Sequence, residues 1–271
     1  MSDQPAQSSG FQVGAGGAER YDQFVFPLMR PFVAELVARV VARGDCTLDV
    51  ACGTGFVTRA AAHVVGPNGS VTGLDINPGM IATAKTHTLP PGVPAEWRVG
   101  SAMELPFPDG WFDTVVCQQG VQFFPSPSAG LAEMRRVLRV GGSLGVTVWA
   151  PIEESPYLSA QMTMLRDGCG MKQAAIGGAF PTIGELQRWA SEAGWLNSKV
   201  ETLRPTVEFP SLDKYIVNHL RALPWSAPFF ALDAHAQAAA VTSMADSLRA
   251  FMHPDGSASI PTSSLLLTAV K

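Results

Sequence analysis

The residue types best suited to holding a small ligand lie in one segment, LDVACGTG, at residues 48–55. The segment reads as an apolar strand that runs into a glycine turn and then into a helix from Phe56. Glycines in such a turn let the backbone approach a ligand closely and adopt positive φ without penalty. Asp49, at the end of the strand, would repel a pyrophosphate and attract an ammonium group. The sequence therefore predicts a ligand with a positive charge near this loop.

A second carboxylate, Asp75, ends the next predicted strand, twenty positions after Gly55. An acidic side chain at that place can accept hydrogen bonds from both hydroxyls of a ribose. Taken alone, an Asp after a strand is as often a helix cap, but beside a glycine loop it indicates a nucleoside. An amino-acid group at Asp49, a ribose at Asp75 and no phosphate between them describe S-adenosylmethionine better than NAD or ATP.

Two other functions stay open on these residues. A dinucleotide fingerprint needs G-x-G-x-x-G, whereas this chain has Gly53, Gly55 and then Thr58. These departures disfavour an NAD(P)-dependent oxidoreductase without removing it. A non-catalytic protein that binds S-adenosylmethionine is the second alternative, because a fold does not guarantee chemistry.

Strands and helices alternate along the first 150 residues, with connections too long for hairpins. This pattern is typical of an α/β fold with an open parallel sheet covered by helices on both faces. The predicted strands are 47–51, 70–74, 95–99, 112–117, 143–149, 199–208 and 264–270, with a Gly141-Gly142 turn before the fifth. The predicted helices are 18–26, 31–41, 56–65, 78–86, 129–138, 157–165 and 183–193. Prolines between 205 and 254 predict several short helices within 212–252.

Composition limits the classes of protein that the chain can belong to. The 271 residues are 46% hydrophobic and 15% charged, with a formal net charge of −4. We expect a disordered tail over 1–17 and one domain over 18–271, with a helical cap insertion at about 209–258. The charge argues against a nucleic-acid partner, no run of residues is apolar enough to span a membrane, and no metal site is expected. Four cysteines without ligand or disulfide spacing favour a cytoplasmic location.

With these residues in view, positions 20–150 resemble the class I S-adenosylmethionine-dependent methyltransferases. The likeness is to the ubiquinone/menaquinone-biosynthesis-like (type 11) branch that acts on small molecules. Four segments carry it in the expected order: LDVACGTG, VTGLDINPGM, GSAMELPFPDGWFDTVVCQQGVQFFP and LAEMRRVLRVGGSLGVTVW. The resemblance implies a Rossmann-like, mostly parallel sheet of seven strands in the order 3-2-1-4-5-7-6, with the seventh strand antiparallel.

The resemblance also implies which residues hold S-adenosylmethionine. Asp49 and the glycine turn would face its methionine part, Asp75 its ribose, and Ile76 its adenine. Ser101 stands where the family often has an Asp. The full set of expected cofactor residues is Tyr21, Asp49, Ala51, Gly53, Gly55, Asp75, Ile76, Met80, Ser101, Ala102, Met103 and Gln118.

Methyl transfer from a sulfonium is an in-line displacement with a neutral leaving group, so positioning does most of the work and a general base is optional. Among the five histidines, His219 in the predicted cap is the best candidate for such a base. An apolar or aromatic small-molecule acceptor, methylated at O, N or C, is expected to meet the aromatic-rich cap. The expected acceptor residues are Phe24, Gln122, Phe123, Trp149, Tyr157 and Trp225. The sequence does not predict an oligomeric state.

Overall fold

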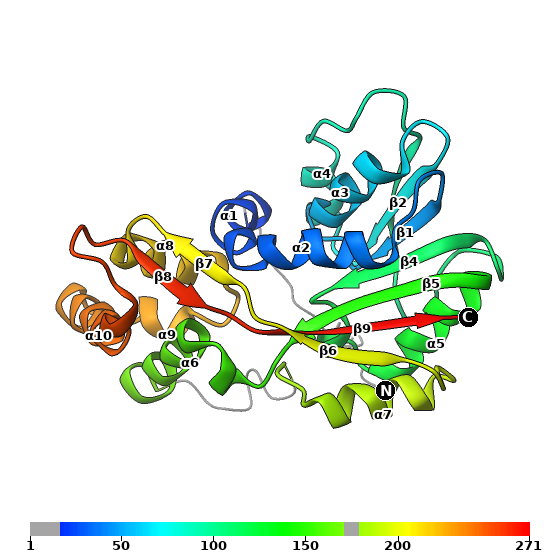
Figure 1. Ribbon diagram of the computed structural model, residues 1–271. Helices are drawn as coiled ribbons and strands as arrows, with labels where there is room; N and C mark the ends of the chain where they lie inside the picture. The colour runs from blue at the N-terminus through cyan, green and yellow to red at the C-terminus, as the bar shows by residue number, and fades with distance from the viewer. Residues whose placement is uncertain (1–16, 171–178) are drawn as a thin grey trace, which may run out of the picture.

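A computed structural model describes residues 17–170 and 179–271 of the chain. Seven strands form one sheet in the order β3-β2-β1-β4-β5-β9-β6 (Figure 1). β9 is the seventh strand of this sheet and runs antiparallel to both of its neighbours. The order predicted from the family resemblance is therefore confirmed. The strands are β1 (Cys46–Val50), β2 (Ser70–Asp75), β3 (Ala95–Val99), β4 (Phe112–Gln118), β5 (Leu138–Trp149), β6 (Lys199–Leu203) and β9 (Ser264–Val270).

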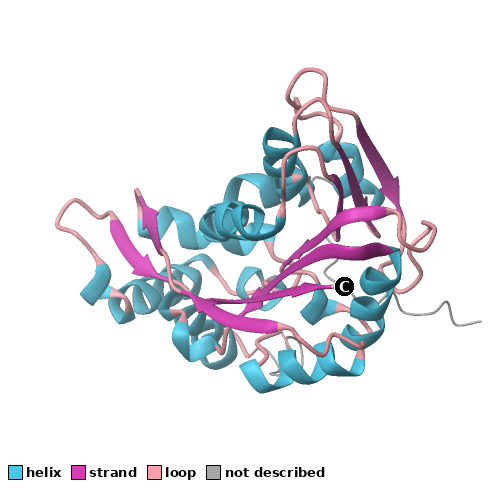
Figure 2. Cartoon of the chain, turned by 45° about the vertical axis from the view of Figure 1, so that its right-hand side comes forward, coloured by secondary structure: helices cyan, strands magenta, loops and turns pink. Residues whose placement is uncertain are grey.

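Helices cover both faces of this sheet (Figure 2). α2 (Phe26–Val40) and α3 (Phe56–Val65) bury apolar side chains on one face, whereas α5 (Pro127–Val137) and α7 (Ile183–Glu192) bury theirs on the other. α4 (Pro78–Ala84) packs on β2 and β3. Asn77 caps α4: its side chain accepts a hydrogen bond from the Gly79 N–H, and Pro78 follows at the first helical position.

Two helices precede the sheet: α1 (Gly17–Phe24) and α2. The sequence predicted the second of them from Pro31, but it begins at Phe26 and contains Pro31 in its interior. The predicted tail over 1–17 lies outside the described residues except for Gly17, which is the first residue of α1.

The segment predicted as one strand over 199–208 is two strands in two sheets. β6 ends at Leu203, and β7 (Thr206–Phe209) pairs instead with β8 (Ala258–Pro261), which the sequence did not predict. Pro205 lies between β6 and β7, and its missing N–H cannot continue the ladder of the main sheet. Its carbonyl accepts a hydrogen bond from the Thr262 N–H. This bond joins the two segments that cross between the sheets, one from β6 to β7 and the other from β8 to β9.

The fifth strand also differs from its prediction. β5 begins at Leu138 rather than at Ser143, so Gly141 and Gly142 lie inside it and not in a turn. Gly141 has a φ of +81°, and the pairing with β4 shifts register between Phe112 and Thr114. The two glycines therefore bend a continuous strand.

A second layer of helices lies beyond the end of the sheet, at the left of Figure 1. We call this part the cap. It comprises α6 (Pro156–Thr163), the π-helical turn Met164–Gly168, β7, α8 (Leu212–Ala222), α9 (Ala227–Phe230), α10 (Ala234–Ser247) and β8. The prolines do divide the 212–252 segment into short helices, as predicted. A separate apolar core, which includes Phe209, Leu212 and Phe229, holds the cap together.

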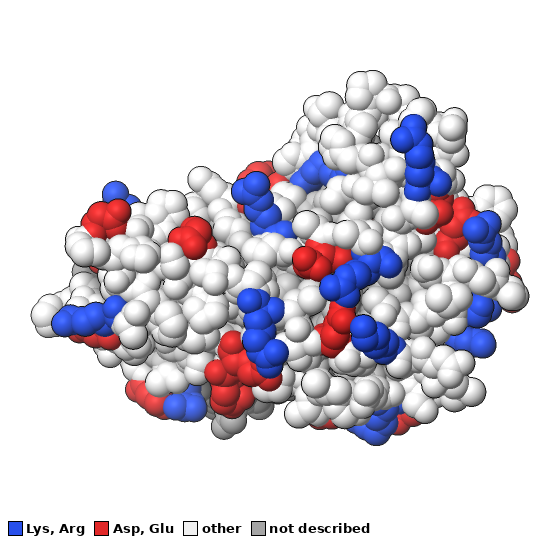
Figure 3. All heavy atoms as spheres, viewed as in Figure 1, with Lys and Arg blue, Asp and Glu red and all other residues white. Residues whose placement is uncertain are grey.

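On the face shown in Figure 3, acidic and basic side chains of the described residues are interspersed and often paired. Arg39 pairs with Glu201, and Arg204 pairs with Glu154 at 2.7 Å. Among the residues that the structure describes, no helix is both long and apolar enough to cross a membrane.

Candidate functional site

A cavity of about 250 Å³ lies where the sheet meets the cap. Its floor is formed by loops at the carboxyl ends of β1, β2, β3 and β4, which is where ligands bind in open α/β sheets. Its roof is formed by α1, α2, α6 and α8. The predicted cofactor residues in its lining are Tyr21, Ala51, Gly53, Asp75, Ile76, Met80, Ser101, Ala102, Met103 and Gln118.

The glycine turn after β1 shapes the floor of this cavity. Ala51 and Gly53 line it and have φ values of +57° and +54°. Gly55 has a φ of +84° but lies outside the lining, and a Cβ there would be 2.4 Å from Trp97 of β3. The two glycines of the turn therefore have different roles: Gly53 leaves room for a ligand, and Gly55 leaves room for Trp97.

Asp75 is the charged side chain of the lining, as far as the described residues show. Its carboxylate accepts hydrogen bonds from the N–H groups of Gly53 and Asn77, both at 2.8 Å. Burial raises the pKa of Asp75, and these two hydrogen bonds oppose the rise. The two N–H groups hold the carboxylate at the floor, where it suits neutral hydroxyl donors and would repel a pyrophosphate.

Asp49 lies beneath the floor and outside the lining, with 2% of its surface exposed. Its Oδ2 accepts a hydrogen bond from the Thr58 hydroxyl at 2.6 Å, whereas its Oδ1 is buried with no hydrogen-bond partner in the described structure. Burial raises the pKa of Asp49 to about 7. An acceptor oxygen left without a partner is costly unless a donor reaches it, so this atom fits a nearby ammonium group.

Residues from α1 and α2 close the cavity over the floor. Tyr21 comes within 3.9 Å of the position that a Cβ would take on Gly53, and its hydroxyl contacts the Met29 sulfur at 3.7 Å. Burial, with the negative charge of Asp75, raises the pKa of Tyr21. Gln118 donates a hydrogen bond from Nε2 to the Met29 carbonyl at 3.0 Å, which ties α2 to the end of β4.

One end of the cavity is apolar and lies between the loops after β2 and β3. Ile76 is 46% exposed although it is a large aliphatic residue, and Met80 beside it is buried. Across from them, the hydroxyl of Ser101 accepts a hydrogen bond from the Met103 N–H at 3.1 Å. An exposed aliphatic face at a cavity wall is suited to a flat apolar group such as an adenine.

The cap forms the opposite end of the cavity, where a cluster of buried polar side chains surrounds His219. Its Nδ1 is 3.0 Å from the Tyr157 hydroxyl and 3.0 Å from the Gln161 Nε2. Burial lowers the pKa of His219 to about 3. A histidine that resists protonation in this way is a poor general base.

The structure separates the six expected acceptor residues into two groups. Phe123, Trp149 and Trp225 line the cavity, as does His219. The others are Phe24, Gln122 and Tyr157, which the lining does not include.

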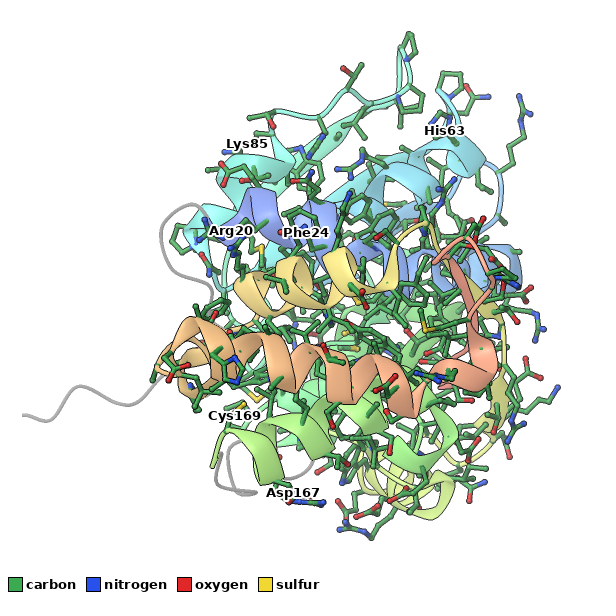
Figure 4. All side chains as sticks on the ribbon, turned by 90° about the vertical axis from the view of Figure 1, so that its left-hand side faces the viewer. Arg20, Phe24, His63, Lys85, Asp167 and Cys169 are labelled. Carbon is green, nitrogen blue, oxygen red and sulfur yellow. The ribbon has the colours of Figure 1, made fainter. Side chains whose placement is uncertain are left out.

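Each of these three side chains packs elsewhere. Phe24 lies on α1 above α8, where its carbonyl accepts a hydrogen bond from Tyr215 at 2.5 Å (Figure 4). Gln122 donates to the Gln119 side chain, and Tyr157 is buried against His219.

Several lining residues were not anticipated from the sequence. Most are aliphatic residues or glycines with no local pattern that marks a ligand site. Two of them are buried polar residues: Gln119, which is 7% exposed, and Gln161, which is 1% exposed in a helix. The lining residues that were not predicted are Val25, Leu28, Met29, Leu74, Gly100, Gln119, Gly120, Phe124, Pro125, Leu158, Gln161, Met162, Ala179, Phe180 and Leu223.

Within residues 17–170 and 179–271, no three His, Cys, Asp or Glu side chains gather closely enough to hold a metal ion.

The sequence is similar to those of known methyltransferases. The profile of a family described as "Methyltransferase domain" matches residues 48–146. A ubiquinone/menaquinone biosynthesis C-methyltransferase from Burkholderia mallei is 32% identical over 191 residues, which cover 69% of this chain and 75% of that protein.

Two solved structures share the fold. The YcgJ protein of Bacillus subtilis has a TM-score of 0.57 and 20% identity, covering 90% of this chain and 97% of that one. A phosphoethanolamine N-methyltransferase of Haemonchus contortus, solved with phosphomonomethylethanolamine and S-adenosylhomocysteine, has a TM-score of 0.57 and 16% identity. That alignment covers 94% of this chain and 57% of that one.

Proposed function

This chain belongs to the class I S-adenosylmethionine-dependent methyltransferases, and from that premise we propose that its acceptor is a small, uncharged, apolar or aromatic molecule. The observation that carries the proposal is the composition of the cavity wall. Its cap end is built from side chains such as Leu158, Leu223 and Trp225. Within the described part of the lining there is no Lys or Arg.

The absence of Lys and Arg from the described lining disfavours an anionic acceptor. Burying a carboxylate or phosphate without an opposite charge is costly. A phosphorylated acceptor like the one in the Haemonchus complex would find no Lys or Arg side chain in the described wall. The name of the Burkholderia relative, a ubiquinone/menaquinone biosynthesis C-methyltransferase, is compatible with an aromatic acceptor methylated at carbon.

S-Adenosylmethionine would bind at the other end of the cavity and would supply an electrophilic methyl group there. Asp75 would accept hydrogen bonds from its ribose, Asp49 would face its ammonium group from below, and the Ile76 side would hold its adenine. Gly55 would act indirectly, by holding the turn against Trp97.

The contribution of this chain to the reaction is alignment. Because the leaving sulfide is neutral, no group has to stabilise a departing anion, and holding the reactants at attack distance is worth about 7–11 kcal/mol. Closure by α1 and the cap would keep water away from the sulfonium carbon. In the described lining the titratable side chains are Tyr21, Asp75 and His219. The raised pKa of Tyr21 and the lowered pKa of His219 disfavour either of them as a base near neutral pH. Asp75 has a raised pKa, but both of its oxygens accept backbone N–H groups and the proposal assigns them to the ribose.

We also propose that the enzyme works in the cytoplasm and without a nucleic-acid partner. Its four cysteines are all free thiols, which suits a reducing compartment. Its net charge of −4 gives no basic field to attract a phosphate backbone.

The test is methyl transfer from radiolabelled S-adenosylmethionine to a panel of phenols, quinols, indoles and amines, each paired with a carboxylated analogue. We expect label on neutral aromatic acceptors and little on the analogues. Transfer confined to the anionic members would contradict the proposed acceptor class. Full S-adenosylhomocysteine binding without any transfer would instead favour a non-catalytic binding protein.

A further inference from the structure

Three buried side chains in the cap form a hydrogen-bond arrangement that cofactor binding does not need. Tyr157 and Gln161 lie one turn apart on α6, and both reach the same nitrogen of His219 on α8, each at 3.0 Å. Their exposed fractions are 1% for Tyr157, 1% for Gln161 and 2% for His219. Packing therefore fixes this arrangement, and water does not compete for it.

The partners of Nδ1 decide where the imidazole keeps its proton. The Gln161 Nε2 carries two hydrogens and no lone pair for bonding, so it can only donate. Nδ1 must therefore accept, and the proton of the neutral ring resides on Nε2. Tyr215 stacks on one face of the ring, with centroids 5.5 Å apart and planes at 27°. Since His219 also lines the cavity, the edge left to face a ligand is the Nε2–H edge.

We infer that His219 donates its Nε2–H to an oxygen atom of the methyl acceptor, and that it positions this acceptor rather than deprotonating it. The inference rests on the proposed function and narrows it. The acceptor is an uncharged, largely apolar molecule with an oxygen of the phenol, quinol, ketone or ether type. A hydrocarbon or a protonated amine would leave the donor unsatisfied, which is unfavourable in a buried site.

The tautomer can be read directly by NMR on the full chain bound to S-adenosylhomocysteine, with ¹⁵N-labelled histidine. We expect His219 to be protonated at Nε2 and unprotonated at Nδ1. The matched variant is Gln161→Glu, whose carboxylate accepts hydrogen bonds and should move the proton to Nδ1. A wild-type ring protonated at Nδ1 would overturn the inference.

Acceptor recognition can be measured with three probes of nearly one shape: 2-isopropenylnaphthalene, 2-acetonaphthone and 2-naphthoate. For the wild-type complex with S-adenosylhomocysteine, we expect 2-acetonaphthone to bind about 2- to 12-fold more tightly than 2-isopropenylnaphthalene, the effect of one net hydrogen bond. This preference should vanish in His219→Leu. It should persist in His219→Gln, because the amide nitrogen of Gln can reach the Nε2 position and still donate.

Enzyme turnover with any acceptor found in the labelling panel separates the two roles of His219. A positioning donor predicts that His219→Gln keeps most of kcat/KM while His219→Leu loses it. A general base predicts that both variants are equally impaired, because an amide cannot take a proton, and that result would contradict the inference.

The probe outcomes also distinguish this inference from the proposed function. Equal binding of 2-isopropenylnaphthalene and 2-acetonaphthone leaves the apolar acceptor class intact and refutes the role of His219. Tightest binding of 2-naphthoate, or no binding of any probe, refutes the acceptor class itself and the inference with it.

Discussion

The two ends of the cavity are built in different ways. The floor consists of backbone turns and carboxylates from segments that lie close together in the sequence, as in the contact between Gly53 and Asp75. The cap end consists of side chains from distant segments, as in the contact of Tyr157 and Gln161 with His219. In the function proposed above, the floor holds the cofactor that the family shares, whereas the cap can change its side chains without disturbing the turn.

The buried carboxylate beneath the floor gives the largest expected effect. The pKa of Asp49 in the folded chain is about 7, above its ordinary value of 3.8. The folded chain therefore binds the extra proton between these values, and stability decreases as the pH rises from about 4 to about 7, by at most about 4 kcal/mol. Urea unfolding across this pH range should show the decrease in unfolding free energy for the wild type. The Asp49→Asn variant should not show the part of the decrease that comes from Asp49.

His219 titrates in the opposite sense, so the comparison with Asp49→Asn isolates Asp49. The pKa of His219 is lowered to about 3, which means that stability falls as the pH drops below its ordinary value of 6.5. Saturation with S-adenosylhomocysteine, whose ammonium group would pair with Asp49, should reduce the Asp49 contribution. Parallel pH profiles for the wild type and Asp49→Asn would contradict the raised pKa of Asp49, and an Asp49 contribution that S-adenosylhomocysteine leaves unchanged would break the proposed link between this carboxylate and the cofactor.

The rigidity of the floor can be tested at its glycines. A Cβ on Gly55 would be 2.4 Å from Trp97, at a φ of +84°. We expect Gly55→Ala to cost about 3 kcal/mol of unfolding free energy, from the backbone strain and the clash together. Gly44→Ala is the matched control, since Gly44 has a φ of +87° with open space around it and should cost about 1 kcal/mol. Equal losses would mean that Trp97 moves aside readily.

Asp75 tests the binding role of the floor. Removing a charged hydrogen-bond acceptor should weaken S-adenosylhomocysteine binding by about 1.5–3 kcal/mol in Asp75→Ala, measured by titration calorimetry. Asp213→Ala removes an exposed carboxylate at the start of α8 and should leave the affinity unchanged. An unaltered affinity in Asp75→Ala would remove the ribose assignment.

The smallest effect is expected in the cap. Tyr157→Phe deletes the hydroxyl that contacts His219 and should lower the unfolding free energy by about 1 kcal/mol. Because this hydroxyl belongs to the cap, S-adenosylhomocysteine affinity should not change. A drop in that affinity would show that the two ends of the cavity are energetically coupled and not independent.

The same contrast explains what the sequence could predict. The turn around Gly53 and the strand end at Asp75 are encoded by neighbouring residues, so their pattern predicted both the sheet and the cofactor end. The contact between Gln161 and His219 joins residues 58 positions apart, and no local period marks it. Helical spacing cannot show which face of α6 meets α8.

The sequence did not predict the exact strand boundaries, for a related reason. Residues 199–208 are rich in β-forming residues on both sides of Pro205, and only the pairing partners show that β6 and β7 belong to different sheets. Gly141 and Gly142 look like a turn in the sequence, but the Lys271 N–H, just after β9, donates to the Gly142 carbonyl and holds them in the pairing between β5 and β9.

The crossings at Pro205 and Thr262 have one more consequence. Two adjacent strands, β6 into β7 and β8 into β9, run from the sheet directly into the cap and are joined there by a hydrogen bond. Two hydrogen-bonded connections of this kind resist hinge motion between the sheet and the cap, so the distance between the glycine turn and His219 should stay constant as acceptors bind and leave. We therefore expect the enzyme to select its acceptors by length, because the paired strands fix this distance.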